Sequence, residues 1–281
     1  MSLSLVTFAV ALDEAARALA LTSPTPWLDA EALLMHACDV GRTALIARAP
    51  DMLAAAQYEK YRAMLERRRA GEPIAYITGV REFWSLSLMV SSAVLIPRPE
   101  TELLVERALA FIPLDRNCNV ADLGTGSGAI ALAIARERPR AVVVATDVSA
   151  EALRIARENA QNLGIGNVEF QASDWFTALA DRSFDVIVSN PPYVRADDPH
   201  LDRGDLRYEP RAALVGGSDG LDAIRRIADG ARARLRVAGQ LLLEHGYDQA
   251  DAVAAVLQKA GFRDYACHND LGGRPRVTEA R

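Results

Sequence analysis

Short apolar runs alternate with longer amphipathic stretches from about residue 100 to the end of the chain. The apolar runs predict buried strands, and the Ala-, Leu- and charge-rich stretches between them predict helices. Regular strand–helix alternation is typical of a doubly wound parallel sheet, so we expect an α/β fold here. The predicted strands are Asn119–Leu123, Val142–Asp147, Val168–Gln171, Phe184–Ser189 and Gln240–His245.

The first seventy residues have a helical pattern instead. Apolar positions recur at helical spacing over Leu3–Leu21, Trp27–Cys38 and Ala54–Arg69, and proline-containing breaks separate these segments. This pattern predicts a small helical bundle. We expect the run Arg67-Arg68-Arg69 to be a solvated helix end, because positive charge is favourable at a helix C-terminus.

A third kind of pattern lies between the helical segment and the predicted sheet. Ile74–Thr78 and Phe83–Val90 are strand-like, with Gly79 near the turn, so they predict a β-hairpin. A chain of 281 residues is also longer than one compact domain usually is. We therefore expect a helical domain over residues 1–72, a β-hairpin linker over residues 73–97 and an α/β domain over residues 98–281.

Composition and charge narrow the class of protein. Apolar residues make up 50% and charged residues 25%, which is ordinary globular usage. The net charge of −5 argues against a chain that coats nucleic acid electrostatically. Three scattered cysteines and four scattered histidines predict neither disulfides nor a metal site. The unpaired cysteines indicate a reducing cytoplasm, and we find no apolar run of membrane-spanning length and no signal-peptide pattern. We also expect a monomer.

A glycine-rich turn follows the first predicted strand. The sequence Asp122-Leu123-Gly124-Thr125-Gly126-Ser127-Gly128 leads directly into a predicted helix, and glycine at such a turn lets a ligand approach the backbone. Asp147 ends the next strand about 20 residues later, which is the position of a ribose-binding acid. A carboxylate there could instead cap the following helix, but Ser149 is better placed for that role. This turn alone also fits a nicotinamide dinucleotide site.

The sequence Asn190-Pro191-Pro192-Tyr193 follows the strand Phe184–Ser189. Proline has no N–H, so this turn offers carbonyl oxygens and the Asn190 side-chain oxygen as hydrogen-bond acceptors. The Tyr193 ring can stack on a flat group. Together these features indicate chemistry on a planar amino group, whereas the alternative interpretation is a turn that merely ends a strand.

In an open parallel sheet, ligands bind at the carboxyl ends of the strands near the switch point. We therefore expect Gly124–Gly128, Asp147, Asp174, Trp175 and Asn190 to converge on one cleft. A non-catalytic nucleotide-binding protein needs only the glycine turn, and a nicotinamide dehydrogenase leaves the Pro-Pro turn without a purpose. An adenine-N6 methyltransferase uses the same amino-directed turn, so the turn does not exclude it.

The residues above carry a resemblance to a known family. Asp122–Gly128 is similar to the S-adenosylmethionine site of Rossmann-like class I methyltransferases, and Asn190–Tyr193 is similar to the branch that methylates amino nitrogens. Three further segments narrow the resemblance to the release factor glutamine methyltransferases: Leu95–Glu102, Tyr208–Pro210 and Gly217–Leu221. The resemblance covers nearly the whole chain.

This resemblance implies an activity, a cofactor and a partner. The activity is transfer of a methyl group from S-adenosylmethionine to the side-chain nitrogen (N5) of the glutamine in the Gly-Gly-Gln motif of class I peptide chain release factors. The second product is S-adenosylhomocysteine, and the helical domain is implied to recognise the substrate. The alternatives are N5-methylation of a glutamine in a ribosomal protein and adenine-N6 methylation of nucleic acid.

The expected site residues follow from the turns and the resemblance together. The Asn190 side-chain oxygen and the Pro191 carbonyl would each accept one N–H of the substrate amide, while Tyr193 packs on its plane and no strong base is needed. The expected catalytic residues are Asn190, Pro191 and Tyr193, and the expected substrate-binding residues are these three with Pro192. The expected cofactor-binding residues are Gly124, Thr125, Gly126, Ser127, Gly128, Asp147, Trp175 and Asn190.

Overall fold

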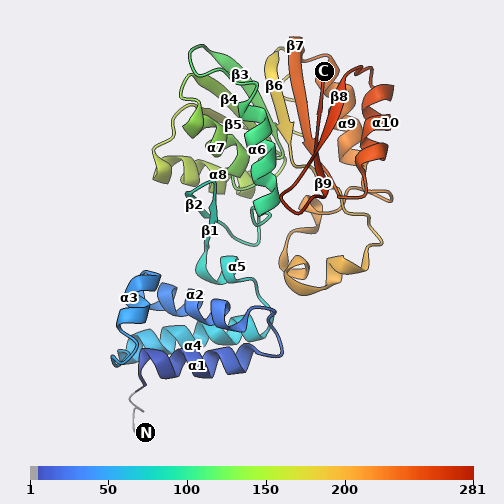
Figure 1. The fold of residues 1–281 in the computed structure, drawn as a ribbon. Coiled ribbons are helices and arrows are strands. Elements are labelled where there is room, and N and C mark those ends of the chain that lie inside the picture. The colour runs from blue at the N-terminus through green and yellow to red at the C-terminus, as the bar shows by residue number, and fades with distance from the viewer. Residues whose placement is uncertain (1–5) are drawn as a thin grey trace. The chain divides into compact units, whose positions relative to one another are not determined.

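The computed structural model describes residues 6–281, and these form two compact units (Figure 1). The smaller unit contains the chain up to Gly79 together with the segment Asp202–Tyr208. The larger unit contains Val80–Leu201 and Glu209–Arg281. The segment Asp202–Tyr208 therefore belongs to the smaller unit, although the residues before and after it in the sequence belong to the larger one.

Helices make up the smaller unit. Three of them agree with the predicted helical segments, although residues 3–5 of the first prediction lie outside the described residues. The Thr7 side chain caps the first helix by accepting a hydrogen bond from the Val10 amide. The buried core of the smaller unit includes Phe8, Leu33 and Tyr61. The elements are α1 (Phe8–Leu19), α2 (Pro26–Cys38), α3 (Arg42–Ala47), α4 (Ala55–Arg69), α5 (Ile74–Thr78) and the 3-10 helix η3 (Gly204–Tyr208).

The arginine run at the end of α4 is not uniformly solvated, so the expectation for its middle residue was wrong. Arg68 is buried and donates to Asp29 at 2.7 Å and to Asp205 at 3.1 Å. Tyr208 donates to the Ala70 carbonyl at 2.7 Å. These bonds attach the segment Asp202–Tyr208 to the end of α4, where the last carbonyls of the helix need partners.

A β-hairpin is present, but one of its two predicted strands was wrong. Ile74–Thr78 forms the helix α5, which ends at Gly79 with a positive φ of 75°, the usual conformation of a C-terminal helix stop. The hairpin consists of β1 (Val80–Phe83) and β2 (Leu86–Met89), and the turn lies at Trp84 and Ser85. It belongs to the larger unit.

The larger unit is built on one seven-stranded sheet with the order β5-β4-β3-β6-β7-β9-β8. The chain moves outward from β3 to β5 and then returns to the other side of β3 with β6, which creates the switch point of a doubly wound sheet. Strands β3 to β7 pair in parallel, and β9 pairs antiparallel with both β7 and β8.

The five predicted strands are all present, and β8 and β9 were not predicted. The strands are β3 (Cys118–Leu123), β4 (Ala141–Asp147), β5 (Val168–Ala172), β6 (Phe184–Ser189), β7 (Leu235–Glu244), β8 (Tyr265–Asn269) and β9 (Pro275–Ala280). The helices are η1 (Pro99–Thr101), α6 (Glu102–Leu109), α7 (Ala129–Glu137), α8 (Ala150–Leu163), η2 (Pro199–Asp202), η4 (Arg211–Ala213), α9 (Asp222–Arg232) and α10 (Ala250–Lys259).

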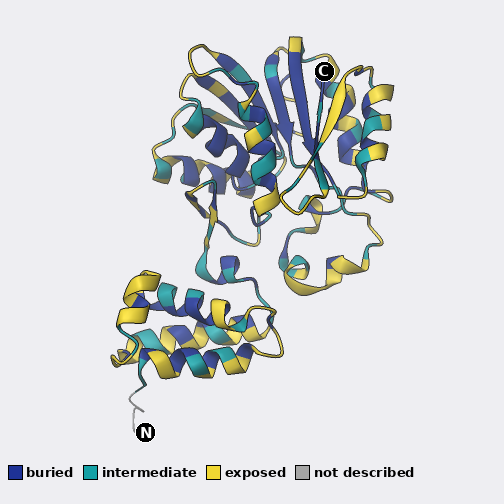
Figure 2. Cartoon of the chain, in the orientation of Figure 1, coloured by how far each residue is buried: buried dark blue, intermediate teal, exposed yellow. Residues whose placement is uncertain are grey.

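Side chains along the central strands point alternately to the two faces of the sheet. Both faces are buried, as Figure 2 shows for β3, β6 and β7. Val120 and Val186 pack with α6 and α7 on one face, whereas Ala121 and Ile187 pack with α9 and α10 on the other. Two apolar layers therefore hold the carboxyl ends of β3 and β6 rigidly side by side. These ends carry the predicted site.

Candidate active site

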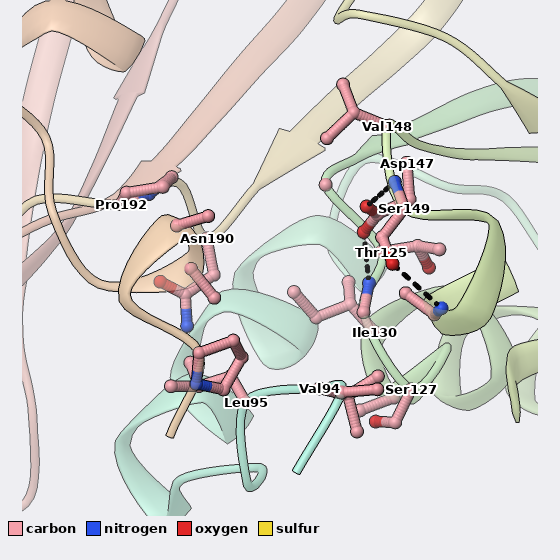
Figure 3. A pocket seen from close by; sticks show the side chains of 18 of the residues that line it. Val94, Leu95, Thr125, Ser127, Ile130, Asp147, Val148, Ser149, Asn190 and Pro192 are labelled. Atoms are coloured by element: carbon pink, nitrogen blue, oxygen red, sulfur yellow. Dashed lines mark hydrogen bonds between the residues drawn. The ribbon is translucent and has the colours of Figure 1, made fainter. Parts of the chain in front are cut away.

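A cavity of about 270 Å³ lies at the carboxyl ends of the strands on either side of the switch point. Figure 3 shows Asn190 and Pro192 on one side of it, opposite Asp147 and Ser149. All of its lining residues belong to the larger unit. The predicted site residues that line it are Gly124, Thr125, Gly126, Ser127, Asp147, Trp175, Asn190 and Pro192.

Four residues expected at this cleft do not line the cavity. Gly128 lies directly before α7, behind the turn. Pro191 is buried, so the contact of its carbonyl with a substrate amide stays a prediction. Tyr193 packs against the core on the α9 side of the sheet, so its contact with a substrate amide stays a prediction. Asp174 is exposed and pairs with Arg226 at 2.6 Å, so the expectation that it reaches the cleft was wrong; its neighbour Ser173 lines the cavity instead.

The glycines of the turn have a steric role. Gly124 and Gly128 have positive φ values of 75° and 85°, which glycine adopts without strain. A Cβ on Gly128 would lie 3.1 Å from Leu132 and 3.2 Å from Ala156, so glycine also permits the turn to lie close against α8. These requirements explain the spacing of glycines in the turn.

The glycine amides themselves already have partners within the protein. The amides of Gly124, Gly126 and Gly128 donate to the Thr146 carbonyl, to the Asp147 carboxylate and to the Thr125 carbonyl, at 2.8 to 2.9 Å. A ligand with an anionic group would therefore need other donors. The first-turn amides of α7, at Ala129 and Ile130 beside the cavity, are the donors placed for such a group.

Asp147 organises its side of the cavity. One carboxylate oxygen accepts from the Gly126 amide and the other from the Ser149 amide, both at 2.9 Å. The Ser149 hydroxyl accepts from Ala152 at the start of α8, so Ser149 is the helix cap, as predicted. A carboxylate offers about four acceptor positions, so Asp147 keeps capacity to accept from ligand hydroxyls.

Trp175 is held in an unusual backbone conformation beside the cavity. Its φ is +52°, and the Ser173 hydroxyl donates to its carbonyl at 2.8 Å. The ring lies against Gly124, where an added Cβ would be 3.5 Å from it. A bulky residue with positive φ persists only where its surroundings fix it, and such residues cluster at functional sites.

Asn190 is oriented by a neighbour that the sequence did not indicate. Its side-chain nitrogen donates to the Thr101 hydroxyl at 3.1 Å, and both residues line the cavity. Because the nitrogen is used in this bond, the amide oxygen is the end of the side chain that can accept from a ligand. The orientation expected of Asn190 is thus supported by a residue at the end of η1.

The Tyr193 hydroxyl is held by a buried carboxylate. It donates to Oε1 of Glu244, the last residue of β7, at 3.3 Å. Burial is the largest influence on the Glu244 carboxyl and raises its pKa to about 7. The Thr101 and Tyr193 hydroxyls act against burial, because they favour the ionised form of Glu244 and so lower its pKa. Burial also raises the pKa of Tyr193, so this residue is a neutral hydrogen-bond donor.

Two of the sequence segments that carried the resemblance are joined by one partly buried ion pair. The Glu209 carboxylate is buried, accepts from the Ile96 amide at 3.2 Å and pairs with Arg98. Arg98 and the neighbouring Pro210 line the cavity. Glu209 therefore joins the segment before the sheet to the segment after the Asn190 turn, a long-range role for which the sequence held no local signal.

Further contacts hold the Asn190 turn from behind. The amide of Val194 donates to the Leu214 carbonyl, and the amide of Gly216 donates to the Val194 carbonyl, both at 2.9 Å. A Cβ on Gly216 would lie 2.4 Å from the Pro192 carbonyl oxygen, so only glycine fits there. This close approach explains why glycines follow Leu214 in the sequence.

The β-hairpin is attached to the glycine turn through one buried side chain. Asn159 on α8 donates to the carbonyls of Ser127 and Met89, at 2.9 and 3.0 Å, and accepts from the Met89 amide at 2.7 Å. All of its hydrogen-bonding groups are engaged. Asn159 thus fixes the position of β2 beside the turn.

Asp122, at the end of β3, is fully buried and only partly satisfied. One oxygen accepts from the Thr125 hydroxyl at 2.6 Å and from the Ala131 amide at 3.2 Å, while Oδ1 has no partner within the described residues. Burial raises the pKa of Asp122 to about 7. Its folded state therefore favours the protonated carboxyl.

This carboxyl makes stability depend on pH. Because its pKa is higher in the folded than in the unfolded chain, folding takes up a proton between these values, and stability falls as pH rises toward 7. From pH 6 to pH 8 the free energy of unfolding should fall by about 1 kcal/mol from this group. Urea unfolding of Asp122→Asn should show a weaker pH dependence, whereas the exposed Asp181→Asn should match the parent; an unchanged dependence in Asp122→Asn would refute the assignment.

No group of three or more His, Cys, Asp or Glu side chains within residues 6–281 is arranged to hold a metal ion. Over the same residues, no helix has both the length and the apolar character needed to cross a membrane.

Comparisons with known proteins agree with this geometry. Residues 99–203 match the family model "Methyltransferase small domain", and residues 10–79 match "PrmC N-terminal domain". A release factor glutamine methyltransferase of Xylella fastidiosa strain Temecula1 is 54% identical over 254 residues, which cover 90% of this chain and 92% of that protein. The protein of the same name from Escherichia coli K12 is 49% identical over 259 residues, covering 92% and 93%.

A solved structure agrees with the fold class predicted from the sequence. A methyltransferase from Pyrococcus furiosus superposes with a TM-score of 0.53 at 19% identity, over 78% of this chain and 96% of that one. At this identity the likeness concerns the fold alone. The predicted α/β, class I methyltransferase fold is confirmed.

Proposed function

This chain belongs to the release factor glutamine methyltransferase family, and we propose that it methylates the N5 nitrogen of the glutamine in the Gly-Gly-Gln motif of class I release factors. The methyltransferase class predicted from the sequence is confirmed. The observation that carries the finer proposal is the position of Asn190, which lines the cavity with its side-chain nitrogen bonded to Thr101. Because the nitrogen is used in that bond, we propose that the Asn190 oxygen accepts a hydrogen bond from the substrate amide.

The cavity fits S-adenosylmethionine as the cofactor. Asp147 can accept from ribose hydroxyls, and Trp175 provides an aromatic surface for the adenine. The first-turn amides of Ala129 and Ile130 can bind the carboxylate of the methionine part. When bound, S-adenosylmethionine supplies an electrophilic methyl group on a positively charged sulfur, and S-adenosylhomocysteine is left after transfer.

The residues of the chain then have to prepare a weak nucleophile. The lone pair of a primary amide nitrogen is delocalised into the carbonyl, so the nitrogen reacts only when the amide is held in the right orientation. Acceptors at Asn190 Oδ1 and the Pro191 carbonyl would each take one N–H and stabilise the positive charge that develops on nitrogen. The nitrogen–methyl bond forms as the sulfur–methyl bond breaks, and the excess proton on nitrogen then leaves to water. The rate gain on this account comes from positioning, with no catalytic base.

The substrate glutamine would enter from the Asn190 side of the cavity. Pro97, Arg98, Pro210 and Ala213 line the same cavity, and the Arg98–Glu209 pair holds their two segments together. We assign recognition of the release factor body to the helical unit, Asp202–Tyr208 included. We also propose that the enzyme is a monomer, that it works in the cytoplasm and that it does not bind nucleic acid.

The substrate class is tested by offering several acceptors to the purified protein with radiolabelled S-adenosylmethionine. A release factor, the ribosomal proteins and duplex DNA are incubated separately, and the label should appear in the release factor alone. Mass spectrometry should then place one methyl group on the glutamine of the Gly-Gly-Gln motif.

A release factor whose Gly-Gly-Gln glutamine is replaced by asparagine is the matched control and should remain unlabelled. Label in a ribosomal protein alone would move the activity to the sibling substrate, and label in DNA would support the adenine alternative. Either result would contradict the proposal.

A further inference from the structure

A chain of buried polar groups runs from Asn190 away from the cavity to the end of β7. The Asn190 side-chain nitrogen donates to the Thr101 hydroxyl at 3.1 Å. The Thr101 hydroxyl favours the ionised form of the neighbouring Glu244 carboxylate, whose Oε2 is a buried acceptor without a hydrogen-bond partner among the described residues. Glu244 also accepts from the Tyr193 hydroxyl at 3.3 Å. Thr101 and Glu244 are 3% and 1% exposed, so water does not compete for these bonds.

The direction of each bond in this chain depends on Glu244. A threonine hydroxyl has one hydrogen, and an ionised carboxylate can only accept. When Glu244 is ionised, the Thr101 hydrogen is directed to it, and the Thr101 oxygen is left to accept from the Asn190 NH2. The Asn190 oxygen then remains for the substrate.

A neutral Glu244 loses this control. Its own proton can be donated to Thr101, whose hydrogen is then free to bond to the Asn190 oxygen. The Asn190 side chain would turn over and present its NH2 to the cavity. Two NH2 groups, one from the enzyme and one from the substrate, would then face each other without an acceptor.

We propose that Glu244 and Thr101 are positioning residues, which fix the Asn190 amide with its oxygen toward the substrate and hold the Tyr193 ring in place. Neither residue has to touch the reacting atoms. One carboxylate, on a strand of which no residue lines the cavity, thereby sets the geometry of two residues of the Asn190 turn. This inference rests on the proposed function and adds two residues to its machinery.

The groups around Glu244 set the pH at which it ionises. Arg276 on β9 favours its ionised form, as do the hydroxyls of Thr101 and Tyr193. Glu100 in η1 opposes ionisation, and burial opposes it most, so the pKa of Glu244 lies at about 7. Ionisation, and with it the productive orientation of Asn190, is therefore complete only above neutral pH.

The test measures kcat for a release factor, and the affinity for S-adenosylmethionine, across pH 6 to 9. In the parent protein kcat should rise with pH around 7. Thr101→Val should lower kcat at pH 8 by about tenfold or more, the cost of one buried hydrogen bond. Thr101→Ser, which keeps the hydroxyl, should restore most of it, and calorimetry should show cofactor affinity within about twofold of the parent, because these bonds do not contact the cofactor.

Glu244→Gln is the sharper variant because its shape is unchanged. A glutamine at this position cannot ionise, so kcat should be about tenfold lower at pH 8 and should lose its rise around pH 7. Thr278→Val is the matched control: Thr278 is buried on β9 and bonds to His245 at 2.8 Å, outside the chain from Asn190 to Glu244. It should keep the parent kcat and pH profile.

The outcomes separate this inference from the proposed function. No methylation of the release factor by the parent protein would remove the proposed function itself. An active parent together with Glu244→Gln and Thr101→Val proteins that keep its kcat and pH profile would overturn the positioning role alone. Thermal unfolding of each variant identifies any protein that fails to fold. If Thr101→Val fails, the pH profile of Glu244→Gln decides; if Glu244→Gln fails, the comparison of Thr101→Val with Thr101→Ser decides.

Discussion

Asn190→Ala is expected to reduce methyl transfer to the release factor by about 10²-fold to 10³-fold or more while cofactor affinity changes little. Removing one preorganised hydrogen-bonding group from a transition-state site costs this much in kcat. The alanine removes the acceptor that orients the substrate amide, whereas Asp147 and Trp175, on the cofactor side of the cavity, are untouched. Single-turnover kinetics and calorimetry with S-adenosylhomocysteine measure the two effects separately.

Asn269→Ala provides the control for this substitution. Asn269 is an exposed residue on β8 and does not line the cavity, so its loss should leave both turnover and affinity unchanged. If the Asn190→Ala protein kept parental turnover, Asn190 would have no part in the mechanism.

Asp147→Ala should have its largest effect on cofactor binding instead. Hydrogen bonds to a charged group contribute about 1.5–3 kcal/mol each, so losing the ribose contacts should raise the Kd for S-adenosylmethionine by about tenfold to hundredfold or more. The same carboxylate accepts from the Gly126 and Ser149 amides, so its removal also releases the glycine turn. Isothermal titration calorimetry measures the change directly.

Asp174→Ala is the matched control for that substitution. Asp174 also follows a strand of the sheet, but it pairs with Arg226 and does not line the cavity. Its removal should leave the Kd unchanged. An unaltered Kd for the Asp147→Ala protein would refute the ribose assignment.

The central sheet could be predicted because its strands are short, buried on both faces and separated by regular helices. β3, β4 and β6 are nearly continuous apolar runs, and their period and length are visible in the sequence. β8 has no such signal, since it lies at the sheet edge and is largely exposed (Figure 2). The helix α5 was mistaken for a strand because five residues are too few to show a period.

The loops at the cavity could be predicted for a related reason. A parallel sheet brings the carboxyl ends of neighbouring strands together, so residues that follow β3, β4 and β6 must lie close to one another. Asp174 shows the limit of this reasoning. Topology brings a loop to the cavity, but only packing decides whether Ser173, Asp174 or Trp175 turns inward.

Side chains that support the site from a distance left no local signal. Thr101 reaches Asn190, Glu209 reaches Ile96 and Asn159 reaches Ser127, over separations of 89, 113 and 32 residues. Each is a polar residue whose partner is fixed only when the whole unit has folded. Arg68 was likewise expected in solvent, because the two carboxylates that bury it lie far away in the sequence.

The most direct test of the account is a crystal structure of the protein with S-adenosylhomocysteine and a peptide that contains the Gly-Gly-Gln motif. We predict that the glutamine side-chain nitrogen lies within hydrogen-bond distance of Asn190 Oδ1 and points at the sulfur, with the Asn190 nitrogen still bonded to Thr101. An Asn190 side chain turned away from the glutamine, or a glutamine bound outside this cavity, would contradict it.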